Sequence, residues 1–76
     1  WPEQLQQHAE TALQQSDYAT AHDLAMQSWK QGSRHGKLCE RNWQVIVEAR
    51  KHSNRLGGVD AARKQQAECL RSTPSQ

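Results

Sequence analysis

The chain has 76 residues, of which 34% are hydrophobic and none is Phe, so it can form only one small domain with a thin core. No run of about 18 apolar residues occurs, which excludes a membrane-spanning helix, and no signal-peptide pattern is present. Four acidic and no basic residues give the first 29 positions a formal charge of −4, whereas ten basic and four acidic residues give the remainder +6.

The two ends of the sequence indicate a piece of a longer protein or a processed chain. The first residue is Trp1 rather than Met, and residues 72–76, STPSQ, have the composition of a linker or tail. We therefore expect the domain itself to occupy residues 1–71.

Apolar residues recur every three to four positions through nearly the whole chain, which predicts an all-α fold. Pro2 suits the first turn of a helix that runs to about residue 15, because the missing N–H of proline costs nothing there. Ser16 or Asp17 can cap the second helix. Gly32 is expected to end that helix in the left-handed conformation.

The longest break between helical patterns is the segment 31–37, QGSRHGK. A third helix is predicted from about residue 37 to Gly57, with the broad apolar face of a central helix. A fourth begins at Val59 and ends before Pro74. The prediction is therefore four helices in two antiparallel hairpins, 1–32 and 33–71.

The two hairpins share a pattern when residue n is laid over residue n+41. The superimposed pairs are Leu5 with Ile46, Tyr18 with Val59, Ala21 with Ala62, Ser28 with Cys69 and Trp29 with Leu70. Helical repeats show such a register, because each unit must stack on a neighbour to bury its apolar face.

The segments 16–29, SDYATAHDLAMQSW, and 57–74, GGVDAARKQQAECLRSTP, resemble the second helix of a tetratricopeptide repeat. In that family small residues lie where this helix crosses its partner, and a proline closes the unit. The sequence departs from the pattern at His8 and Arg50, and its 41-residue offset exceeds the family's period of about 34. Other helical bundles, including three-helix domains of trafficking proteins, remain alternatives.

Neither a catalytic motif nor a complete metal site is present in the sequence. No Walker loop, nucleophile elbow, HExxH or CxxC occurs. His35 and Cys39 have the spacing of two ligands on one helix face, but a structural zinc needs about four. Glu40 and Glu48 have basic neighbours within helical reach, and His8 and His22 fall on or beside apolar stripes. We expect no enzyme, no metal and no cofactor.

Cys39 and Cys69 are predicted to be reduced. If the third helix turns back at Gly57, Cys39 lies 18 residues before the turn and Cys69 lies 12 after it. The difference is roughly 9 Å at about 1.5 Å per residue, beyond the roughly 7 Å that a disulfide tolerates between Cα atoms. Reduced cysteines fit a reducing compartment, and a cytoplasmic location is expected.

The tetratricopeptide resemblance implies that the first helix of each hairpin lines a groove for a peptide or a partner helix. We therefore expect a non-catalytic protein-interaction module or scaffold domain, with an acidic peptide as the partner that suits a groove basic at one end. The residues at matching positions are Gln6, Glu10 and Gln14 in the first hairpin and Gln44, Val47, Lys51, Asn54 and Arg55 in the second.

Two other binding modes stay open. A basic helical nucleic-acid-binding domain would use the cations of the second half on phosphates. Those residues are Arg34, Lys37, Arg41, Arg50, Lys51, Arg55, Arg63 and Lys64. Trp43 could stack on a base, although its place on the apolar side of a central helix favours a core role. Self-association, or packing on other repeats, could use Trp1, Trp29 or Leu70.

Overall fold

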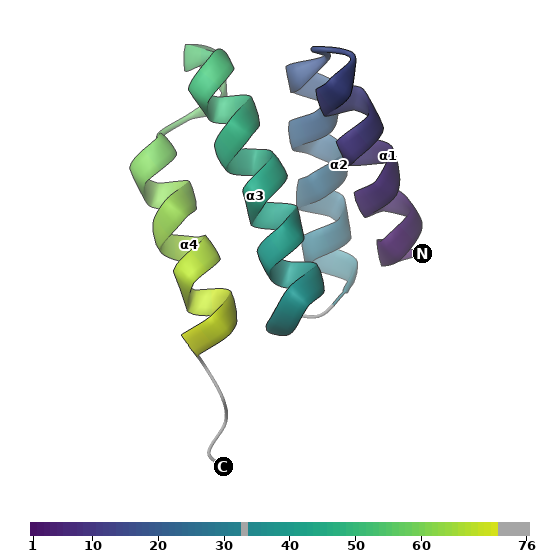
Figure 1. Cartoon of the computed structure of the whole chain (residues 1–76), viewed down its shortest axis with the longest axis vertical. Coiled ribbons are helices and arrows are strands. Elements are labelled where there is room, and N and C mark those ends of the chain that lie inside the picture. The colour runs from purple at the N-terminus through teal and green to yellow at the C-terminus, as the bar shows by residue number, and fades with distance from the viewer. Residues whose placement is uncertain (33, 72–76) are drawn as a thin grey trace.

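The computed structural model describes residues 1–32 and 34–71, apart from the side chain of Asn54. Four helices lie side by side in two antiparallel hairpins (Figure 1). They are α1 (Pro2–Gln14), α2 (Tyr18–Gln31), α3 (Gly36–His52) and α4 (Val59–Arg71), with a 3₁₀ turn, η1 (Asn54–Leu56), between the last two. No strand occurs among the described residues, so the predicted all-α fold is confirmed. The predicted tail, 72–76, lies outside them.

The turn between α1 and α2 is tight because Ser16 adopts the left-handed conformation, with a φ of 63°. Its N–H donates to the carbonyl oxygen of Leu13 at 3.0 Å, which satisfies one of the free carbonyls at the end of α1. The Oδ1 atom of Asp17 accepts from the N–H of Thr20 at 3.4 Å. Of the two predicted caps of α2, Asp17 is therefore the one used.

Gly32 ends α2, but the left-handed conformation predicted for it is wrong. Its φ of −104° and ψ of −155° are extended backbone, which any residue can adopt. A Cβ atom at this position would lie 2.8 Å from the Cβ of Pro2 and 2.9 Å from the carbonyl oxygen of Ser28. Glycine is needed here because the start of α1 packs against the end of α2 and leaves no room for a side chain.

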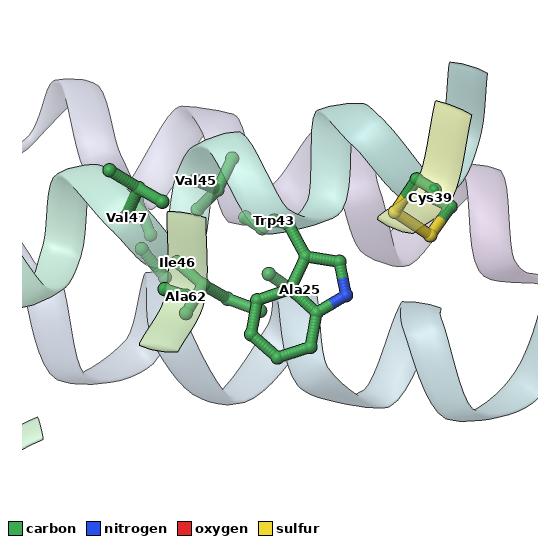
Figure 2. Close-up of a cluster of buried hydrophobic side chains, with 11 residues drawn as sticks. Ala25, Cys39, Trp43, Val45, Ile46, Val47 and Ala62 are labelled. Atoms are coloured by element: carbon green, nitrogen blue, oxygen red, sulfur yellow. A yellow bond between two sulfur atoms is a disulfide. The ribbon is translucent and has the colours of Figure 1, made fainter. Parts of the chain in front are cut away.

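α3 is the central helix, as its broad apolar face predicted, and it packs against each of the other three helices. Figure 2 shows Trp43 and Ile46 of α3 in the core together with Ala25 of α2 and Ala62 of α4. Several of the other buried apolar positions are alanines: Ala9, Ala12, Ala21 and Ala49. Short side chains let helices approach closely, so a few large residues suffice to fill the interior.

Trp43 is a core residue, as its position on α3 predicted, because only 4% of its surface is exposed. Its ring meets the half-buried ring of Trp29 edge to face, with centroids 5.2 Å apart. This geometry is the favoured one for an aromatic pair. The contact joins α3 to the last turn of α2.

Cys39 and Cys69 form a disulfide, so the prediction that they are reduced is wrong. Their Cα atoms are 5.6 Å apart. The prediction extended the third helix to Gly57, whereas α3 ends at His52 and η1 takes up the following residues. Thirteen residues then separate Cys39 from the end of α3, and ten separate the start of α4 from Cys69. The remaining difference is about 4.5 Å, and the expectation of a reducing compartment loses its basis.

Among the described side chains, three polar ones are buried with these apolar residues. The Ser28 hydroxyl donates to the carbonyl oxygen of Pro2 at 2.7 Å, and the Gln6 amide donates to the Glu10 carboxylate at 2.6 Å. Asn42 of α3 is fully buried, and both polar atoms of its amide lack a hydrogen-bond partner. A buried, unpaired amide destabilises the folded state.

Replacing both cysteines, Cys39→Ser with Cys69→Ser, should lower the free energy of unfolding by about 2–4 kcal/mol, because the bond closes a loop between positions 30 residues apart. Urea denaturation without reductant, followed by circular dichroism, measures the loss. Dithiothreitol should cause the same loss in the unsubstituted chain and none in the double variant. Equal stability of the two proteins without reductant would contradict the prediction.

Asn42→Leu should raise the free energy of unfolding by about 1–3 kcal/mol, because a leucine of similar volume removes two unpaired polar atoms from the core. The same urea experiment measures the gain. Ile46→Val, which shortens a fully buried neighbour on the same helix, is the control and should cost about 0.5–1.5 kcal/mol. A leucine variant less stable than the unsubstituted chain would show that the amide stabilises the fold.

Candidate functional site

One polar surface follows the whole length of α3 on the side away from its buried face. We call it the outer stripe of α3. Its residues recur at intervals of four and three, as required for one face of a helix, and are Lys37, Arg41, Gln44, Glu48 and Lys51. All are exposed except Glu48, which is partly exposed.

The neighbouring helices contact the outer stripe on both sides. Arg41 lies 3.6 Å from the carboxylate of Glu10 in α1, and Gln44 accepts a hydrogen bond of 2.7 Å from Gln66 in α4. Along the stripe, the Gln44 amide donates to Glu48 at 3.1 Å. These exposed contacts order the side chains but add little stability. The stripe is thus a continuous polar surface supported by three helices.

The residues predicted to bind a partner do not all reach this surface. Gln44, Lys51 and Arg55 are exposed and Glu10 is partly exposed, whereas Gln6 and Val47 keep only 1% and 4% of their surface exposed. The prediction that these two line an open groove is wrong. The side chain of Asn54 lies outside the described part of the chain.

Helical periodicity accounts for the two buried positions. Gln6 precedes the buried Ala9 by three residues, and Val47 follows the buried Trp43 by four. Each therefore lies on the buried face of its own helix. The resemblance to the repeat family predicted that both residues face the groove, although helical periodicity places them on the buried face.

The cations predicted to bind nucleic acid lie on several different surfaces. Lys37, Arg41 and Lys51 belong to the outer stripe of α3, while Arg34 and Lys64 line a cleft between α2 and α4. Arg55 and Arg63 are exposed on η1 and α4, respectively. The structure therefore does not gather the eight residues into one basic patch.

Arg50 is used inside the fold. Its Nε–H donates to His22 Nε2 of α2 at 3.2 Å, and its Nη1–H donates to the carbonyl oxygen of Gly58 at 3.0 Å. Burial lowers the pKa of His22 from its ordinary 6.5, the charge of Arg50 lowers it further, and Asp23 opposes both effects. Arg50 thus ties α2 to the segment before α4 through a neutral histidine.

A cleft of about 510 Å³ lies near the disulfide. We call it the Trp29 cleft. Its walls come from the last turn of α2, the segment that leads into α3, and α4. The lining residues are Trp29, Arg34, His35, Lys64, Gln65 and Glu68.

The sequence reasoning missed the Trp29 cleft, although it identified two of its cations. Arg34 and His35 precede Cys39 by five and four residues, and Glu68 directly precedes Cys69. Pairing the two cysteines would have brought these segments together. The mistaken register therefore hid the cleft as well as the disulfide.

Among residues 1–32 and 34–71, no group of three or more His, Cys, Asp or Glu is placed to hold a metal ion. Within the same ranges, no helix is long and apolar enough to cross a membrane. Trp1 and Leu70, predicted to support self-association, are exposed at 81% and 58%.

No family model, curated protein or solved structure matches the chain. The resemblance to tetratricopeptide repeats therefore stays a prediction.

The stability of the fold should decrease as the pH falls below about 6.5. The pKa of His22 is lower in the folded than in the unfolded chain, so the unfolded state binds the proton first. The contribution of neutral His22 is complete above 6.5 and is lost as the pH falls through the folded pKa. Urea denaturation at half-unit steps from pH 8 to pH 5 measures this dependence.

His22→Gln should flatten the pH profile, because its amide oxygen can still accept from Arg50 but does not titrate in this range. His8→Gln is the matched control, since His8 is exposed on α1. It should leave the slope between pH 7 and pH 5 unchanged. A glutamine at position 22 that keeps the full slope would assign the acid sensitivity to other groups.

Proposed function

We propose that this chain is a non-catalytic protein-interaction module that binds an acidic peptide or partner helix along the outer stripe of α3 and η1. The observation that carries the proposal is the exposed, polar length of α3, supported by Glu10 of α1 and Gln66 of α4. Lys51 and Arg55 provide positive charge toward its end. A rigid helix with its side chains held by neighbours can bind a second chain at a low cost in side-chain entropy.

The packing of the helices supports a tetratricopeptide-like arrangement of the two hairpins. α1 packs against both α2 and α3, so the first helices of the two hairpins are in contact, and α4 packs against α3. Hairpins that stack in this order present their first helices on one face. A partner on that face would contact α1 and α3 together.

Nucleic acid is the competing partner class, and the distribution of the cations argues against it. Phosphate binding draws its affinity from several neighbouring cations. Here Arg50 is hydrogen-bonded within the fold, and Arg34 and Lys64 line the cleft rather than the outer stripe.

The disulfide bears on the compartment. Structural disulfides are typical of oxidising compartments, whereas the cytoplasmic location was expected from reduced cysteines.

Lys51→Glu with Arg55→Glu should weaken acidic-partner binding by about tenfold or more, because two attractive charges become repulsive. The measurement is a pull-down from nuclease-treated extract, followed by titration of the retained protein. Arg63→Glu, which changes one exposed cation on α4, is the control and should leave binding within about twofold.

A different result would favour nucleic acid. Micromolar binding to mixed-sequence DNA or RNA, falling steeply with salt, indicates phosphate contacts. That binding should then weaken with glutamate at Arg34, Lys37, Arg41 and Arg63 as well. Such a pattern, with no protein retained after nuclease treatment, would contradict the proposed function.

A further inference from the structure

The Trp29 cleft has the size and composition of a binding site. Its volume of about 510 Å³ falls within the range of about 300–1,000 Å³ typical of sites for small ligands or single side chains of a partner. It joins an aromatic wall, Trp29, to two cations, Arg34 and Lys64, that come from segments 30 residues apart. An apolar wall with a few convergent charges is the usual composition of a specific site.

The positive charge of this cleft is available to a ligand. Within residues 1–32 and 34–71, neither Arg34 nor Lys64 forms an ion pair. Glu68, the carboxylate among the lining residues, lies 3.3 Å from Arg71 and is partly neutralised there. The ligand that the cleft attracts is therefore an anion.

Arg34 is already oriented for binding. Its guanidinium lies over the Trp29 ring, with Cζ 4.2 Å from the ring centroid. Stacking occupies a flat face of the guanidinium and leaves the N–H groups at its edge, which match the two oxygens of a carboxylate. Lys64 on the α4 wall can add a second positive charge.

The walls of the cleft are held by an aromatic contact and a covalent bond between helices. Trp29 contacts the buried Trp43, and the Cys39–Cys69 disulfide fixes α4 beside the start of α3. Figure 2 shows the indole nitrogen of Trp43 on the side of the disulfide, and this N–H has no hydrogen-bond partner. A site with fixed walls loses little entropy when it binds.

We propose that the Trp29 cleft binds a carboxylate side chain of an acidic protein segment, between the guanidinium of Arg34 and the ammonium of Lys64. This inference rests on the proposed function and adds a second contact surface to it. A peptide carboxylate fits better than a phosphate chain, because the described lining sets the carboxylate of Glu68 against no more than two Lys or Arg side chains, Arg34 and Lys64. A nucleic-acid backbone would need a longer row of cations.

The test is a titration of the ¹⁵N-labelled 76-residue chain with hexaglutamate, followed by nuclear magnetic resonance at low ionic strength. Saturable shifts are expected at the Trp29 indole N–H, the Arg34 Nε–H and the Lys64 and Gln65 amides. Arg34→Gln and Lys64→Gln should each weaken this binding by about tenfold, the loss of one charge-assisted hydrogen bond.

Arg63→Gln is the matched control, because Arg63 is exposed beside Lys64 on α4 but does not line the cleft. It removes the same charge from the chain and should leave the dissociation constant within about twofold. Equal weakening by Arg63→Gln and Lys64→Gln would mean that only net charge matters, and this would overturn the inference. The amide spectra of the variants show whether each is folded.

The location of the shifts separates this inference from the proposed function. Saturable shifts confined to Gln44, Lys51 and Arg55 would overturn the cleft and leave the interaction module intact. A twelve-nucleotide single-stranded DNA can be titrated at the same ionic strength. If it binds the cleft more tightly than hexaglutamate does, the site is a phosphate site. If no cleft residue shows a saturable shift, the inference is overturned.

Discussion

The covalent bond between Cys39 and Cys69 is the constraint on which the second half of the structure depends. α4 packs mainly against α3, and its buried side chains are Ala62 and Cys69. Burial of such small groups contributes less free energy than burial of Leu or Phe side chains. The bond therefore fixes the position of α4, and with it one wall of the Trp29 cleft.

The first hairpin is held in a different way, by the close approach of helices with short side chains. Ala9, Ala21 and Ala25 are fully buried, and Gly32 leaves room for Pro2. Close packing fills the interior with few large residues, but it leaves a small amount of apolar surface to stabilise the fold. In such a core the unpaired amide of Asn42 lowers the free energy of unfolding by a substantial share of the total.

The sequence predicted the fold well because helical periodicity is a local signal. It identified the four helices, the central role of α3 and the burial of Trp43. It failed where the outcome depends on how distant segments meet. The end of α3 at His52, five residues before Gly57, changes the register of two helices and brings Cys39 to Cys69. The Trp29 cleft follows from that register, so local patterns could not reveal it.

The separation of charge along the sequence becomes a separation in space, because each hairpin is a contiguous segment. The first 29 residues contain Asp and Glu but no Lys or Arg, while Arg34 and Lys64 of the cleft and Lys51 of the outer stripe come from the rest of the chain. The Arg41–Glu10 pair lies where the two halves meet. An acidic partner is therefore attracted more strongly to α3 and α4 than to α1, which orients its approach before any contact forms. The disulfide matters more for the cleft than for the outer stripe, because α4 provides three lining residues of the cleft but contacts the stripe through Gln66. Loss of the bond therefore disturbs the cleft more than the stripe, most of whose side chains belong to α3.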